Sequence, residues 1–372
     1  GGGQGGGGGP ATPAGPGDST GVTGSEIRIG LHAPLSGAAP LPQASFNSGR
    51  QQYWDFVGKV NGRIVKVFVE NDGYNPSQAK SVCDKLIQQD KVFILIGGGG
   101  ADQIAACAQT AAQQGVPYLS AGVDEGILRQ LPNYFAVSMS YVQQAPLLVQ
   151  YINRFAKPSN RTVAIVKDRS PSFNNVVNAV GAAAQRAGYK VLVRQASNPT
   201  SDAQWLSQNR IETAFPIMAP SYFVQMVNAP GGGIEHWVGV GITMGLNTVA
   251  NAACSGVNGQ AYDGAMFFSP FPGLDAIGRM DPNFSRAGGR DDIELALWGL
   301  NKTIHQVLLK TGKRVDRQRF VQALERNTIS SGVYPQLRHR SGNHFGATSV
   351  HALVADCGRK QYVTKATFAS KF

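Results

Sequence analysis

Residues 27–37 read IRIGLHAPLSG, and this stretch decides the fold class. Its first half, 27–31, is a short run rich in β-branched residues, which is typical of a β-strand. The second half contains Pro34, Ser36 and Gly37 and predicts a loop. Because a helical pattern follows over 48–58, the stretch predicts the first strand, loop and helix of an α/β domain.

The alternation of short strands and longer helices continues along the chain, which predicts βαβ units and a parallel sheet covered on both faces. Further strands are expected at 65–70, 93–96, 118–120, 163–167, 190–194, 214–218, 237–240 and 265–269. Further helices are expected at 76–89, 101–114, 143–155, 173–187, 201–209, 221–228, 291–309 and 316–326.

The alternation runs once over about 26–140 and starts again at 160–168, until the Gly-, Pro- and Asp-rich segment 270–290 breaks it. We therefore expect two doubly wound parallel-sheet lobes, joined by a hinge with several crossings, and a ligand cleft between the carboxyl ends of their strands. The expected lobes are 25–140 with about 272–335, and 141–271 with about 336–372.

The composition excludes a wholly disordered chain. Of the 372 residues, 42% are hydrophobic, and apolar runs such as 92–96 are far shorter than the roughly 20 residues of a membrane helix. The net charge is +11, of which the segment from Arg279 to the end supplies +9, from 16 lysines and arginines against 7 acidic residues. These basic residues form no arginine-rich run or aromatic stacking motif, so we expect a solvated face and no nucleic-acid partner; a contact with anionic lipid or an acidic protein partner is the alternative.

Four cysteines without a CxxC spacing favour two disulfides over a zinc site, and disulfides indicate an exported protein. Three pairings are possible. We predict Cys83–Cys107, because the two lie on helices of successive βα units, which pack side by side on a parallel sheet. Cys254 and Cys357 are then left to pair with each other.

Residues 1–24 contain 12 glycines and 3 prolines, and their only charge is Asp18. Such a stretch has no apolar face to offset the entropy of ordering it, so we expect a flexible tether. Glycine runs commonly follow the acylated cysteine of a bacterial lipoprotein, which predicts a mature lipoprotein without its signal peptide and lipid-bearing cysteine; an expression linker is the alternative.

No catalytic or cofactor motif is found. The tetraglycine 97–100 does not complete a GxGxxG pattern, because Asp102 or Gln103 stands where the last glycine belongs. The chain has no Walker motif, no HExxH and no GxSxG elbow, and His339 and His344, five residues apart, are a weak metal candidate. We expect no cofactor, no metal and no enzyme activity.

Taken in order, several of these segments resemble type I periplasmic binding proteins, and within them the leucine/isoleucine/valine-binding-protein-like receptors of ABC importers. The resemblance covers about 26–372 and is carried by the opening stretch together with 70–76, 96–97, 115–121 and 163–168.

This resemblance implies a ligand site at the strand-to-helix turns of both lobes. In lobe 1 it implies the opening loop and the turns after the third and fourth strands, with Ser36, Gly100, Ala101, Asp102, Gly122, Val123 and Asp124. In lobe 2 it implies three turns, with Ser172, Phe173, Ser221, Tyr222, Thr243 and Met244.

The sequence departs from the amino-acid-binding pattern of that family. Ala101 stands at the usual carboxylate-binding serine, Asp124 at the ligand-binding threonine, and Thr243 at the glutamate that pairs with an α-ammonium group. Asp102 is interpreted either as a helix N-cap or as an acceptor for ligand hydroxyl or amine groups. Phe173 and Tyr222 are interpreted as core residues or as stacking faces for a ring-shaped ligand.

We therefore expect a monomeric extracellular solute-binding lipoprotein, held to the outer face of the membrane by a lipid anchor, that closes by a hinge on a small molecule and delivers it to an ABC permease. The expected ligand is an aromatic, polyol, amide or amine compound rather than a branched-chain amino acid. The alternatives are a ligand-sensing receptor domain and a secreted α/β enzyme.

Overall fold

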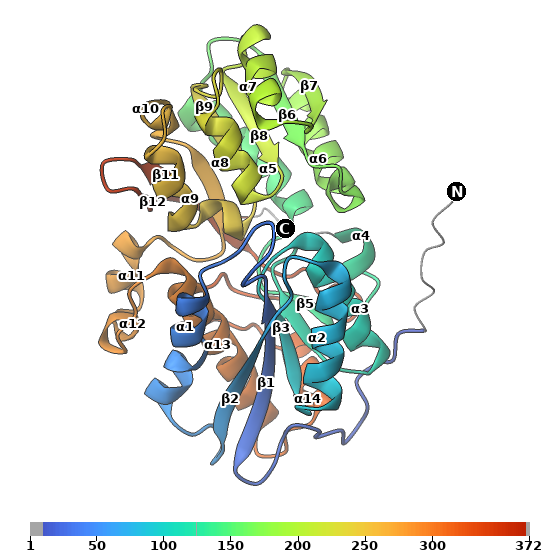
Figure 1. Ribbon diagram of the computed structural model, residues 1–372. Helices are drawn as coiled ribbons and strands as arrows, with labels where there is room; N and C mark the ends of the chain where they lie inside the picture. Colours follow the sequence, from blue (N-terminus) through green and yellow to red (C-terminus); the bar gives the residue numbers. More distant parts are fainter. Residues whose placement is uncertain (1–9, 124, 370–372) are drawn as a thin grey trace.

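The computed structural model describes residues 10–123 and 125–369, and it divides into two lobes, each built on one sheet (Figure 1). None of the helices in this described part is long and apolar enough to cross a membrane. The expectation of a tether over residues 1–9 lies outside the described residues.

The sheet of lobe 1 has the order β2-β1-β3-β4-β5, and all of its strand pairs are parallel. The neighbours α2 and α3 cover one face, and α1 and α13 pack together on the other, with α14 beside α13. The elements are β1 (Glu26–Ala33), α1 (Gln43–Val57), β2 (Ile64–Asn71), α2 (Pro76–Gln88), β3 (Ile94–Gly97), α3 (Ala101–Gln113), β4 (Tyr118–Ser120), α4 (Glu125–Leu128), β5 (Tyr134–Ala136), α13 (Asp292–Thr311) and α14 (Arg317–Arg326).

The sheet of lobe 2 has the order β12-β11-β10-β9-β8-β6-β7. Its strands are β6 (Thr162–Lys167), β7 (Lys190–Gln195), β8 (Thr213–Ile217), β9 (His236–Gly239), β10 (Met266–Ser269), β11 (Ser349–Asp356) and β12 (Gln361–Ala369). Its helices are α5 (Tyr141–Tyr151), the π-helix 152–156, the 3₁₀ turn 171–173, α6 (Asn174–Arg186), α7 (Pro199–Gln208), α8 (Pro220–Asn228), the 3₁₀ turn 242–245, α9 (Asn247–Cys254) and α10 (Gly259–Tyr262). Between the lobes follow α11 (Leu274–Met280), which packs against β12, and α12 (Pro282–Arg286), whose Phe284 ring contacts Trp298 of α13 in lobe 1.

The expectation of two doubly wound α/β lobes is confirmed, with one correction in lobe 2. Strands β11 and β12 are antiparallel to their neighbours, so this sheet is mixed rather than wholly parallel. The sequence pattern missed both strands, because a chain-terminal hairpin needs no helical crossover and so lacks the strand–helix alternation. It also missed β5, which is only three residues long.

The chain crosses between the lobes after β5, after β10 and again before β11. The last crossing lies nearer to Ser349 than to the expected position 336. Residues up to about 347 remain on lobe 1, where the backbone carbonyl of His344 accepts from Ala136 N and the ring of His339 bonds the carbonyl of Ala136. These contacts hold the segment against β5.

Residues 10–24 also differ from the expected tether, because they pack against lobe 1 (Figure 1). The side chain of Asn133 accepts from Ala14 N and donates to the carbonyl of Thr12. Asp18 pairs with Arg317, whose side chain is only 4% exposed. Polar partners on lobe 1 therefore supply the order that the composition of the segment does not.

The predicted disulfides are confirmed. Cys83 on α2 is bonded to Cys107 on α3, with their Cα atoms 5.8 Å apart, and Cys254 is bonded to Cys357, with 5.2 Å between Cα atoms. The first bond joins the neighbouring helices α2 and α3 on one face of the lobe 1 sheet. The second fastens the end of α9 to the turn between β11 and β12, which holds the terminal hairpin on lobe 2.

Candidate functional site

A cavity of about 380 Å³ lies between the two lobes, at the carboxyl ends of their strands. We call it the outer cavity. Lobe 1 and the first turn of α5 line it with Pro34, Ala39, Pro40, Leu41, Tyr74, Gly100, Ala101 and Tyr141. Lobe 2 lines it with Phe173, Pro216, Ile217, Met218, Pro220, Ser221, Val224, Gln225, Val240, Thr243, Met244, Thr248, Val249 and Ala252.

The wall of the outer cavity is predominantly apolar, and none of its described lining residues carries a charge. Its polar groups are neutral: the hydroxyls of tyrosine, serine and threonine, and the amide of Gln225. Burial raises the pKa of the Tyr74 hydroxyl to about 12, and burial also raises the pKa of Tyr141, so both phenols stay protonated at neutral pH and can donate hydrogen bonds.

The glycine loop after β3 lets the backbone approach this cavity closely. Gly100 has a φ of 76°, so a larger residue there would be strained, and its Cβ would displace the side chain of Gln103. Gly100 is also the N-cap of α3 and offers no capping side chain. The first backbone N–H groups of α3 therefore lack a capping partner, beside a cavity that Gly100 and Ala101 line.

Tyr74 is placed by a buried polar cluster behind it. The ring of His32 is fully buried between Asp72 Oδ2 and the hydroxyl of Tyr118, each 2.7 Å away. The other oxygen of Asp72 accepts from Tyr74 N, which holds Tyr74 at a φ of 55°. A non-glycine residue in this left-handed conformation is strained, and such strain persists where the surroundings fix it, often at functional sites.

Two hydrogen-bonded contacts join the lobes beside the cavity. Asp102 Oδ1 accepts from Ser172 Oγ at 2.5 Å and from Ser170 Oγ at 3.0 Å. Ser221 Oγ donates to the carbonyl of Ala38 at 3.0 Å. Asp102 is thus neither the N-cap of α3 nor a lining residue, and its carboxylate is engaged by lobe 2.

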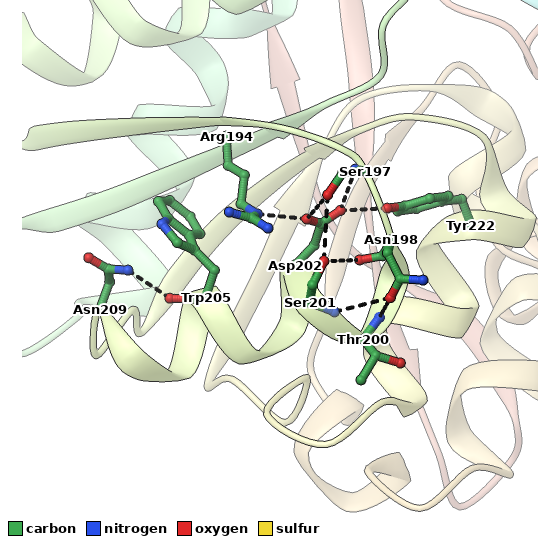
Figure 2. Close-up of polar contacts among 9 residues, drawn as sticks. All are labelled: Arg194, Ser197, Asn198, Thr200, Ser201, Asp202, Trp205, Asn209 and Tyr222. Carbon is green, nitrogen blue, oxygen red and sulfur yellow. Dashed lines mark hydrogen bonds and ion pairs between the residues drawn. The ribbon is translucent and has the colours of Figure 1, made fainter.

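Tyr222 does not line the cavity, and its hydroxyl donates to Asp202 Oδ2 at 2.5 Å (Figure 2). Asp202 is fully buried and also accepts from Arg194 Nε at 2.6 Å and from Ser197 N at 2.9 Å. Burial by itself would raise the pKa of Asp202, but the bonds from Tyr222, Ser197 and Arg194 lower it below its usual value. The network fastens the first turn of α8 to α7, so Tyr222 positions Ser221 rather than stacking on a ligand.

The remaining predicted residues fall into two groups. Phe173, Thr243 and Met244 line the outer cavity together with Gly100, Ala101 and Ser221. Outside it lie Ser36, which accepts from Asn71 Nδ2, and the buried Gly122 and Val123, whereas Asp124 lies outside the described residues.

Sequence reasoning missed Tyr74, Tyr141 and the run 216–218 at the end of β8. A signal existed for Tyr74, which stands in the turn after the second predicted strand. Tyr141 directly follows Ser140, which forms a capping box with Gln143 and so marks the start of α5. Both tyrosines therefore stand at helix or turn boundaries that the sequence indicates.

One cluster in the described part of the chain has the spacing of a metal site, formed by His32, Cys83 and Cys107. Both sulfur atoms belong to a disulfide, and both ring nitrogens of His32 already have hydrogen-bond partners. All of these donor atoms are already bonded, so the cluster does not fit a metal ion.

The fold and the cavity between its lobes define a binding protein of two hinged domains. The chain belongs to the periplasmic binding protein family, whose profile matches residues 26–358. A curated relative, an amino acid binding protein of Pseudomonas aeruginosa PAO1, is 24% identical over 178 residues. That match covers 45% of this chain and 45% of the relative, so it spans about half of the relative's length.

Solved structures show the same fold. The fatty acid ABC transporter substrate-binding protein of Thermomonospora curvata has a TM-score of 0.77 at 16% identity and is covered over 95% of both chains. The leucine-binding protein of Thermotoga maritima MSB8 has a TM-score of 0.74 at 11% identity, over 92% of this chain and 99% of that one. A solute-binding protein of Rhodopseudomonas palustris BisB5, in complex with 3,4-dihydroxybenzoic acid, has a TM-score of 0.75 at 16% identity, over 93% and 98%. The family and fold implied by the resemblance are thereby confirmed.

Proposed function

We propose that this protein is the extracellular solute-binding component of an ABC importer, and that it captures an uncharged, largely apolar small molecule between its lobes. The observation that carries the proposal is the outer cavity, which both lobes line and in which no described lining residue is charged. Cavities of this size, with a few neutral polar groups in an apolar wall, are typical of small-molecule sites.

The mechanism is closure of the two lobes about the chain crossings. Asp102 and Ser221 hold the lobes together with hydrogen bonds that separation of the lobes would break. A ligand that contacts both walls favours this closed state, and closure changes the surface offered to a permease. The ligand is released unchanged, since the described lining residues offer no pair of nucleophile and base.

The lining argues against a branched-chain amino acid as the ligand. A zwitterion enclosed here would lose the hydration of two charges, and an unpaired buried ion costs several kcal/mol. Ala101 has no side-chain donor for its carboxylate, and Thr243 has no charge for its ammonium group. We expect the loss to be about 3–5 kcal/mol, or several hundredfold in affinity or more.

The neighbouring structures support a broad choice of ligand within one fold, because their own ligands include a fatty acid, a leucine and a dihydroxybenzoate. We further propose that the chain works as a monomer at the outer face of the cell membrane. The Gly-rich composition of residues 1–9 is consistent with a lipid-anchored amino-terminus. The docked segment 10–24 would then attach the anchor to lobe 1 and leave lobe 2 free to move.

The test is to identify what the protein retains. Protein purified without refolding is examined by native mass spectrometry, and small molecules released on denaturation are identified and then titrated back by calorimetry. We expect a neutral, mainly apolar compound with micromolar or tighter affinity, and no binding of leucine, isoleucine or valine. Sub-micromolar binding of any of these three would contradict the proposed ligand class.

A matched pair of variants locates the site. Ala252→Phe puts a ring at the wall of the outer cavity and should abolish binding, whereas Asn251→Phe, the adjacent exposed residue that does not line the cavity, should leave binding unchanged. If both variants lose ligand binding equally, or both keep it, the ligand binds elsewhere.

A further inference from the structure

A second apolar space opens from the outer cavity into lobe 1. We call it the inner compartment, and its volume is about 80 Å³. The two spaces share four lining residues, Leu41, Gly100, Tyr141 and Thr243, so they adjoin along one wall.

The inner compartment lies between the sheet of lobe 1 and helix α13. Leu31 and Ile96 come from β1 and β3, and Ile293, Leu297 and Leu300 come from two turns of α13. These side chains are at most 6% exposed, so the compartment reaches into the core of the lobe. Phe46, Ile104, Val123, Val137, Leu246 and Ala296 also line it.

Three hydroxyl-bearing residues, Tyr141, Thr243 and Tyr334, also line the inner compartment, and their hydroxyls make no hydrogen bond to another described residue. Tyr141 and Thr243 stand on the wall that the two spaces share, so they form its mouth. These hydroxyl oxygens are not among the buried polar atoms that lack a partner, so they are open to solvent and free to bond an oxygen atom of a ligand at this mouth. The hydroxyl of Ser120, in contrast, is already bonded within lobe 1.

We propose that the inner compartment is a tail-binding subsite, and that the ligand is an elongated, uncharged amphiphile. Its oxygen-bearing head lies in the outer cavity against Tyr141 and Thr243, and an unbranched alkyl tail enters lobe 1 beside α13. This inference rests on the proposed function, because it needs the outer cavity to be the ligand site.

The size of the compartment sets the length of the tail. A water-sized group takes a share of about 30 Å³ in a liquid, so 80 Å³ holds about three groups of that size. A methylene group is of similar size. Each methylene that leaves water is worth about 0.8 kcal/mol, so affinity should rise about fourfold per carbon until the compartment is full.

The probes are primary straight-chain alcohols from butanol to nonanol, with cyclohexanol as a compact probe that fits the outer cavity alone. Calorimetric or competition titration of each alcohol gives the dependence of Kd on chain length. We expect cyclohexanol to bind weakly, the straight-chain alcohols to gain about fourfold per added carbon, and the gain to stop once the tail fills the compartment.

Two variants narrow the compartment, and the first does so at a residue that does not line the outer cavity. Ala296→Leu projects from α13 into it and should end the gain two or three carbons earlier, with the Kd for cyclohexanol unchanged. If the first variant fails to fold, Gly99→Ala serves in its place. Its Cβ would lie 3.4 Å from Leu41 Cδ1 and from Pro34 Cδ, and so it narrows the entrance from the outer cavity to the inner compartment. Tyr141→Phe should weaken all the alcohols alike, by about fivefold to tenfold, because it removes one donor to the head.

The outcomes separate the two proposals. If cyclohexanol binds but the straight-chain alcohols show no gain with length, or if the narrowed variants keep the wild-type dependence, the tail subsite is wrong and the outer cavity stands. If neither cyclohexanol nor any straight-chain alcohol binds, the proposed ligand class fails and the subsite fails with it.

Discussion

Removing the carboxylate of Asp102 should open the cleft. This single side chain on lobe 1 receives hydroxyl donors from Ser170 and Ser172 of lobe 2, at 3.0 and 2.5 Å. The substitution Asp102→Ala removes both bonds without leaving a buried charge behind. All three residues are only half-buried, so the partners regain water when the lobes separate.

The magnitude follows from these two bonds. Hydrogen bonds to a charged group contribute about 1.5–3 kcal/mol each when buried, and solvent access reduces this. We expect a loss of about 1–3 kcal/mol from the closed state, which shifts the balance between open and closed forms by about 5-fold to 150-fold. A ligand that binds the closed form loses affinity in proportion to the closed fraction.

Small-angle scattering and calorimetry test this prediction together. The Asp102→Ala variant without ligand should have a larger radius of gyration than the wild type, and its Kd should rise about 5-fold or more. Ser172→Ala should show part of the effect, and a double-mutant cycle should give a coupling energy of at least about 0.5 kcal/mol. Asp55→Ala, an exposed acidic residue on α1, controls for the change of net charge.

A radius of gyration and a Kd that are unchanged in Asp102→Ala would refute the reasoning, because the two hydroxyl contacts would then contribute nothing to closure. A loss of unfolding free energy as large as the loss of binding free energy would also count against it, since the side chain joins the lobes and does not support either core.

Three further predictions concern stability. Burial raises the pKa of Asp292 to about 6, so between about pH 4 and 6 the folded state holds a proton that the unfolded state has lost. The free energy of unfolding therefore falls as the pH rises through this range. Chemical denaturation across pH 4–7 should show that Asp292→Asn removes up to about 3 kcal/mol of this pH dependence. Replacing Cys254 and Cys357 with serine opens a disulfide with a sequence separation of 103 and should lower the free energy of unfolding by about 2–5 kcal/mol; an unchanged denaturation midpoint would contradict the bond. Truncation before Ser25 should lower the melting temperature, because Arg317 loses Asp18 and keeps a buried charge; a Tm equal to that of the full chain would show that the docking contributes nothing.

The fold was largely predictable because parallel α/β architecture repeats a strong local signal. Short β-branched runs such as 27–31 and 163–167 alternate with helices that begin at recognisable caps, among them Asn75 and Asn198. The disulfide pairing followed from the same alternation, since successive helices on one face lie side by side. The hairpin 349–369 escaped prediction because its pairing is antiparallel and no helix marks it.

The candidate site was predicted only in part. In doubly wound α/β folds the turns at the carboxyl ends of the strands line the ligand cleft. Gly100, Ala101, Phe173 and Thr243 stand in such turns and could therefore be expected there. Which way a side chain on such a turn points depends on its distant partners. Tyr222 turns away because Asp202 on another helix accepts its hydroxyl, and no local pattern contains that information.

The sequence by itself determined the α/β class, the two lobes, the pairing of the cysteines and the absence of a catalytic motif, because periodicity, turn chemistry and motif spacing are local properties. Only the tertiary structure decided that Asp102 joins the lobes, that residues 10–24 dock on lobe 1, and that an apolar compartment continues from the cleft beneath α13. Each of these depends on contacts between segments far apart in the chain, and a cavity is the space that such segments leave between them, which no single stretch of sequence encodes.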